Sequence, residues 1–157
     1  MDGLMVDELP LFDEVAETLR ALLPADYDDV QMRSRRWGIK VWFGGRDPGR
    51  EHYEAQVLGS RDVPEATVLA IEVGFHAEHR DPAANEAALA VLTAGEKRWR
   101  RALGADAVAG VFLGRAEDWR RLSETLIDPD LGDPELGMEI AARLTDYITT
   151  LEPLRRA

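Results

Sequence analysis

Hydrophobic residues recur every three or four positions near the start of the chain, which is the spacing of a helix with one buried face. The residues of this stripe are Leu11, Val15, Leu19 and Leu22. Asp13 and Glu14 would lie in the first turn, where acidic side chains are favourable, and Pro24 would end the helix. We therefore expect a helix over residues 10–23.

The hydrophobic period changes to two after residue 29, which is the period of a strand with one face in the core. In the clearest run, Trp37, Ile39, Val41 and Phe43 alternate with Gly38, Lys40 and Trp42. Turn-like segments rich in Gly, Pro and Asp separate this run from two later ones. The expected strands cover residues 29–35, 37–43, 52–58 and 66–75. They predict an antiparallel meander of about four strands.

Helical signals return at Asp81, a good N-cap that is followed by Pro82 at the first helical position. The run from Val108 to Leu113 is continuously apolar, as in a strand covered on both faces. The elements expected in this part of the chain are a helix over 81–104, a strand over 108–113, a short helix over 117–127, and a last helix that opens at Asp133 and ends before Pro153.

The order of the expected elements is α-β-β-β-β-α-β-α-α. Runs of strands next to runs of helices are typical of the α+β class, with helices packed on one face of a mostly antiparallel sheet of about five strands. A length of 157 residues fits one domain over 1–157, and we expect residues 1–8 to form a flexible tail.

Composition narrows the function classes. Thirty acidic residues against 19 Lys and Arg give a formal net charge of −11, which disfavours binding to nucleic acid or to an anionic membrane. The chain has no Cys, so it offers no thiolate nucleophile or thiolate metal ligand. No apolar run approaches the roughly 18 residues of a membrane span, and the acidic N-terminus does not resemble a signal peptide. We expect a cytoplasmic protein.

His76 and His79 are the first candidates for chemistry, because a zinc or iron site needs imidazoles and carboxylates that converge. Their spacing is not that of a metallopeptidase helix, and residues three apart on a strand point to opposite faces. The candidate ligand set is Glu54, Glu72, His76 and His79, with His52 as another choice of third ligand. The favoured interpretation is instead two surface histidines where a strand leaves the sheet.

Two resemblances rest on the order of elements. The expected order loosely resembles that of the PD-(D/E)xK nuclease core, which consists of a helix, acid-bearing strands, a helix and a strand. That core holds magnesium on carboxylates and needs a lysine two residues after the last acid. The nearest match, Glu54-Ala55-Gln56, has Gln in place of that lysine. The order is also similar to that of the small acidic chaperones of secretion systems, although no motif carries this likeness. Neither resemblance identifies a family.

A basic cluster in the first hairpin is the remaining candidate. Its residues are Arg33, Arg35, Arg36 and Lys40, and Trp42 would lie on the solvent face of the neighbouring strand. Arg and Trp are typical interface residues. The sequence therefore predicts a non-enzymatic binding domain without catalytic residues or cofactor, which binds an unknown protein or a second copy of itself. The alternative is a metal-dependent hydrolase or a degenerate PD-(D/E)xK-like nuclease.

Overall fold

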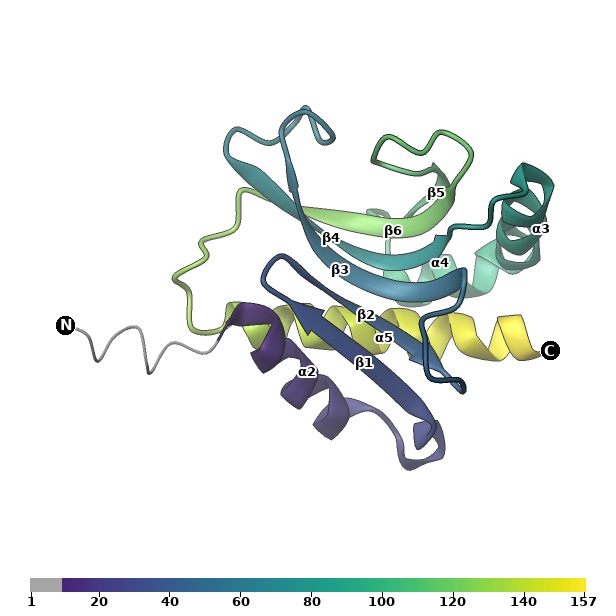
Figure 1. The fold of residues 1–157 in the computed structure, drawn as a ribbon, viewed down its shortest axis with the longest axis horizontal. Coiled ribbons are helices and arrows are strands. Elements are labelled where there is room, and N and C mark those ends of the chain that lie inside the picture. Colours follow the sequence, from purple (N-terminus) through teal and green to yellow (C-terminus); the bar gives the residue numbers. More distant parts are fainter. Residues whose placement is uncertain (1–9) are drawn as a thin grey trace.

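The computed structural model describes residues 10–157, so the tail expected over residues 1–8 lies outside the described part (Figure 1). The helices are α2 Leu11–Leu22, the short 3-10 helix η1 Ala25–Tyr27, α3 Pro82–Thr93, α4 Glu96–Leu103 and α5 Leu136–Arg156. The strands are β1 Val30–Arg35, β2 Gly38–Phe43, β3 Glu51–Gly59, β4 Leu69–Ala77, β5 Val108–Val111 and β6 Arg120–Ile127.

The strands form one antiparallel sheet with the order β1-β2-β3-β4-β6-β5. The α+β class and the antiparallel sheet are confirmed, and the first four strands form the expected meander. The sheet has six strands rather than about five, because the segment expected to form a short helix over residues 117–127 is strand β6. The order of elements is therefore α-β-β-β-β-α-α-β-β-α after the omission of η1.

The helix prediction for 117–127 was wrong because tertiary pairing decided the conformation. Leu122 and Leu126 are four residues apart, which suits a helix, but on a strand they also share one face. In β6 they lie on the helix-covered side, and the segment pairs with β4 along its whole length. Strand β5 also differs from expectation, since it is an edge strand whose Val108 and Val111 side chains are exposed.

The helix expected over residues 81–104 is interrupted after Thr93, which gives α3 and α4. Asp81 is the N-cap, as expected, and its carboxylate accepts a hydrogen bond from the Ala83 amide. At the interruption, a Cβ placed on Gly95 would lie 3.0 Å from the Leu154 side chain. Pro153 lies inside the last turns of α5, rather than beyond its end.

The helices cover one face of the sheet. Figure 1 shows α2 and α5 on one side of it, where they pack on each other and on the strands. The core between them is formed by side chains that include Val15, Leu19, Val73, Phe75, Leu144 and Ile148. No helix within residues 10–157 is both long and apolar enough to cross a membrane.

The β3–β4 and β5–β6 connections rise on the side of the sheet away from α5 (Figure 1). Leu58, Val63, Ala66 and Ala70 form a second, small apolar cluster there, against which Leu113 packs. Asp128, at the end of β6, holds the β3–β4 connection, because its carboxylate accepts hydrogen bonds from the backbone amides of residues 67–69. These segments enclose polar side chains on the face that carries no helix.

Candidate metal centre

Two His-x-Glu segments on paired strands build a buried polar cluster. In β3 the segment is His52-Tyr53-Glu54, and in β4 and the residue after it the segment is His76-Ala77-Glu78. Side chains alternate between the two faces of a strand, so Tyr53 lies in the helix-covered core and the His and Glu side chains lie on the other face. The register places His52 opposite His76, so the two segments meet.

One donor atom from each of the four side chains lies within 4.8 Å of the other three. The His52 Nε2 atom is 3.0 Å from Glu54 Oε1 and 3.5 Å from Glu78 Oε2. The His76 Nδ1 atom is 3.1 Å from the same Glu54 oxygen and 3.2 Å from the same Glu78 oxygen. Two nitrogens and two oxygens thus alternate around one point.

The nitrogen–oxygen distances are compatible with four edges of a tetrahedral metal site. Zinc bonds to imidazole nitrogen and carboxylate oxygen are about 2.0–2.2 Å long, so neighbouring donor atoms of a tetrahedron lie about 3.3–3.6 Å apart. The four nitrogen–oxygen distances, 3.0, 3.1, 3.2 and 3.5 Å, lie close to that edge length. A metal ion therefore needs only small displacements of these side chains.

The outer nitrogen of His52 fixes its ring orientation and proton. Its Nδ1 lies 3.0 Å from the carbonyl oxygen of Gly49, which can only accept a hydrogen bond. The Nδ1 atom is therefore the donor. The inner Nε2, which faces Glu54 and Glu78, carries a second proton or is left with a lone pair for a metal.

His76 has the same arrangement with a carboxylate as its outer partner. Its Nε2 lies 3.0 Å from Glu72 Oε2, and Glu72 also accepts hydrogen bonds from Ser123 Oγ at 2.6 Å and Gln56 Nε2 at 2.9 Å. Carboxylate partners of this kind orient metal-bound imidazoles and make them more basic. The inner Nδ1 of His76 again faces the two carboxylates.

The pKa shifts of this cluster favour protonated imidazoles beside ionised carboxylates. Burial opposes the charging of His52 and His76, but contacts with carboxylates outweigh it, so the pKa of His52 is raised and that of His76 lies well above its ordinary value. Burial likewise opposes ionisation of Glu54, but hydrogen bonds from both imidazoles lower its pKa to about 2. Against the same burial effect, the imidazoles also lower the pKa of Glu78 and Glu72.

The centre is enclosed. His76 is 0% exposed and His52 2%, while Glu54 and Glu78 retain 9% and 8%. The ring of Phe112, from the β5–β6 connection, lies edge-on to His76 with centroids 4.9 Å apart. Glu54 also lines a surface pocket, so the centre can be reached through this carboxylate.

The structure brings together three of the four residues that the sequence suggested as metal ligands. Glu54, Glu72 and His76 lie in the cluster, with Glu72 in contact with His76 rather than among the four central donors. His79 lies elsewhere, and its Nε2 is 2.8 Å from Glu51 Oε2. The favoured interpretation of two surface histidines is wrong for His76, because β4 is covered on both faces there.

His52 and Glu78 complete the cluster. The sequence offered His52 only as an alternative third ligand and did not suggest Glu78. The signal for both was in the sequence, since a His-x-Glu segment occurs twice, once on the expected strand 52–58 and once directly after the expected strand 66–75. An antiparallel register that aligns the two histidines also brings the two glutamates to the same face.

The basic cluster expected on the first hairpin divides into two parts. Arg33 stacks on Trp42 with its guanidinium 5.5 Å from the ring centroid, and lies 3.6 Å from Asp47. Trp42 does lie on the helix-free face, but it is only 5% exposed and donates to the Gly45 carbonyl, so it offers little surface to a partner. Arg35, Arg36 and Lys40 line a separate pocket with Glu54.

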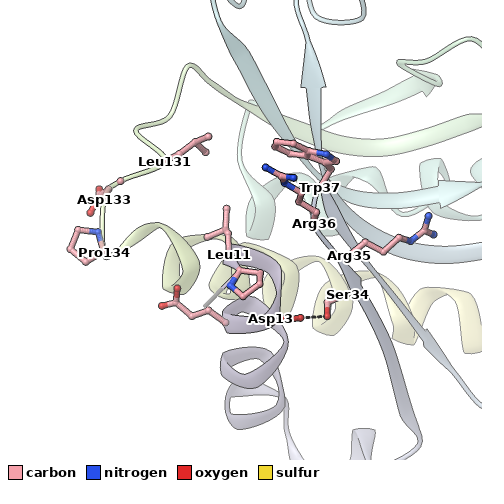
Figure 2. A pocket seen from close by; sticks show the side chains of 12 residues that line it. Leu11, Asp13, Ser34, Arg35, Arg36, Trp37, Leu131, Asp133 and Pro134 are labelled. Atoms are coloured by element: carbon pink, nitrogen blue, oxygen red, sulfur yellow. Dashed lines mark hydrogen bonds between the residues drawn. The ribbon is translucent and has the colours of Figure 1, made fainter. Parts of the chain in front are cut away.

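Trp37 at the hairpin turn is 56% exposed, although the alternating pattern assigned it to the core. A pocket of about 900 Å³ lies between this turn, the start of α2 and the segment before α5. Figure 2 shows Arg36 beside the Trp37 ring and Leu131 across the pocket, while Arg35 points away from Leu131. Ser34 donates to Asp13, which joins β1 to α2 at this pocket.

Comparisons of the chain with protein-family models, with curated proteins and with solved structures found no match. The function is therefore inferred from the geometry of the centre and its surroundings.

Proposed function

We propose that this protein is a metal-binding domain that holds one divalent transition-metal ion, of the zinc class, between His52, His76, Glu54 and Glu78. A single observation carries the proposal. The outer nitrogen of each imidazole is committed to an acceptor, while the inner nitrogens and two carboxylate oxygens alternate around one point with nitrogen–oxygen distances of 3.0–3.5 Å. Imidazole with carboxylate suits zinc and its neighbours better than magnesium or calcium, which prefer oxygen ligands.

The arrangement supports binding rather than hydrolysis. Catalytic zinc sites keep a position open for water, whereas structural sites are closed by four protein ligands. Four donors converge here, from two adjacent strands under a covering loop. A bound ion would tie β3 to the end of β4 and would displace the protons that the raised pKa values favour on the two imidazoles.

The competing explanation is an internal ion-pair network that never binds metal. Such networks occur, but burying charges is expensive and their net contribution to stability is small. The two explanations differ in a measurable way, because only the metal site predicts stoichiometric retention of an added ion.

The test is native mass spectrometry after addition of one equivalent of Zn²⁺ to metal-free protein and removal of loosely bound ions. We expect one zinc per chain, and loss of that zinc in His76→Ala. His79→Ala is the matched control, because His79 also contacts a carboxylate but lies outside the centre. No retained zinc in the wild type, or equal loss in both variants, would contradict the proposal. Visible absorption of the Co²⁺ form would report the four-coordinate geometry.

A second proposed function is protein binding or self-association through the first hairpin. The exposed Trp37 ring, with the Arg36 guanidinium 4.9 Å from its centroid, favours it. Aromatic residues paired with arginine are common anchors of interfaces. Sedimentation equilibrium of wild-type protein and of an Arg33→Glu, Arg35→Glu variant tests self-association. A dimer that dissociates in the variant supports it, and a monomeric wild type refutes self-association.

A further inference from the structure

A pocket lined by cationic side chains lies beside the proposed metal centre, with Glu54 in common. This pocket, of about 330 Å³, opens on the helix-free face, beside the β1–β2 turn. Gly38 of β2, which pairs with Gln56 of β3, lines the pocket. Because Gly38 has no side chain, the pocket is deeper at this position. Arg35, Arg36 and Lys40 supply its cations, and Glu54 is the one acidic residue that lines it.

The charge of this pocket is opposite to that of the whole protein. Three cations face one carboxylate, in a chain whose formal net charge is −11. The Glu54 carboxylate is already compensated by His52 and His76, which both lie within hydrogen-bond distance of it. A metal ion at the centre would compensate it in the same way, so the pocket stays positive with or without metal.

The cations have few other partners. No carboxylate within residues 10–157 lies at ion-pair distance from Arg35 or Arg36, and Lys40 is 3.9 Å from Glu78 Oε1. The Arg36 guanidinium is held on the exposed Trp37 ring, which limits the entropy it would lose on binding a ligand. Guanidinium groups bind carboxylate and phosphate groups through two parallel hydrogen bonds.

We propose that this pocket binds a small oxyanion, a phosphate or carboxylate group, between Arg35, Arg36 and Lys40. The Trp37 ring would contact the part of the ligand that extends from the oxyanion. This site goes beyond the proposed metal site and does not depend on it, although Glu54 belongs to both.

The test is an NMR titration of ¹⁵N-labelled protein with inorganic phosphate and, separately, with succinate, each against sodium chloride at equal ionic strength. We expect saturable shifts of the Trp37 indole and the Gly38 amide with a Kd of about 1 mM, the range of a few charge-assisted hydrogen bonds. Tighter binding of phosphate would assign the site to phosphoryl ligands, and tighter binding of succinate to carboxylates, which includes acidic peptides.

The variant Arg35→Gln, Arg36→Gln should weaken binding at least about tenfold, because two charged donors are lost. Arg33→Gln is the matched control: Arg33 lies on the same strand face as Arg35, but stacks on Trp42 outside the pocket. Shifts no different from those with chloride, or equal weakening in both variants, would overturn the proposal. Titration of the metal-free and zinc-treated protein separates the two proposals, since a failure of metal binding would leave these shifts in place.

Discussion

The carboxylate of Glu72 meets the imidazole of His76 on the same strand, with Gly74 midway between the two residues in the sequence. The two residues lie four apart on one strand, so their backbones are about 13 Å apart, yet their side chains approach to 3.0 Å. Both point to the helix-free face, whereas a Cβ at position 74 would be directed at the backbone of β6. The close approach of β6 to β4 beside this contact therefore depends on the absence of a side chain at position 74.

Gly74→Ala should be strongly destabilising. An added Cβ would lie 2.4 Å from the Leu122 carbonyl oxygen and 2.5 Å from Ser123 Cα, so β6 would have to move. We expect a loss of about 3 kcal/mol in the free energy of unfolding, measured by urea denaturation, at the upper end for overpacked sites. Gly110→Ala in β5 is the control, since its Cβ would meet nothing within 4 Å. A change below about 0.5 kcal/mol at position 74, as at ordinary surface sites, would show that the strands adapt.

Glu72→Gln tests the carboxylate that orients His76. The amide keeps the shape of the side chain but lacks the charge that makes the imidazole basic, so the zinc affinity should fall by about 10- to 100-fold. Competition with a chromophoric chelator measures this change. Glu51→Gln serves as the control, because Glu51 is the partner of His79. Equal affinities of wild type and Glu72→Gln would mean that Glu72 has no role in metal binding.

The fold was largely predictable because periodicity reports burial. Helix α2 and strands β1–β4 have clear patterns, and each was expected within a few residues of its bounds. Segment 117–127 failed because two leucines four residues apart fit both a helix and a strand. Only its pairing with β4 distinguishes the two, and that contact is distant in the sequence.

The centre was only partly predictable for a related reason. The sequence pointed to His76 and His79 because they are close together in one segment. In the structure their side chains lie apart, since β4 ends at Ala77, between the two residues. The useful signal was the repeat of His-x-Glu at residues 52 and 76, which matters only when the two strands pair in the observed register. The burial of these groups could not be inferred, because it comes from connections that fold over the sheet.

Metal binding should release protons and weaken as the pH falls. His52 and His76 have raised pKa values, so in the metal-free protein both stay protonated to higher pH than free imidazoles do, whereas a metal ligand must be a neutral imidazole nitrogen. Each bound ion should then displace up to about two protons, and affinity should drop by up to about 100-fold per pH unit. Calorimetry in buffers of different ionisation enthalpy counts these protons. A count of zero at pH 6 would contradict the proposed exchange.

Zinc should also stabilise the folded protein against heat. An ion that binds only the native state at a free concentration of 100 times its Kd adds about 2.7 kcal/mol to the free energy of unfolding. For a domain of this size, that corresponds to a rise in Tm of roughly 5–10 °C. Differential scanning calorimetry of metal-free protein, with zinc and then with excess EDTA, measures the rise and its reversal. His79→Ala should keep the full shift and His76→Ala should lose it, because only His76 lies among the four donors. An unchanged wild-type Tm would mean that the buried charges balance one another without an ion.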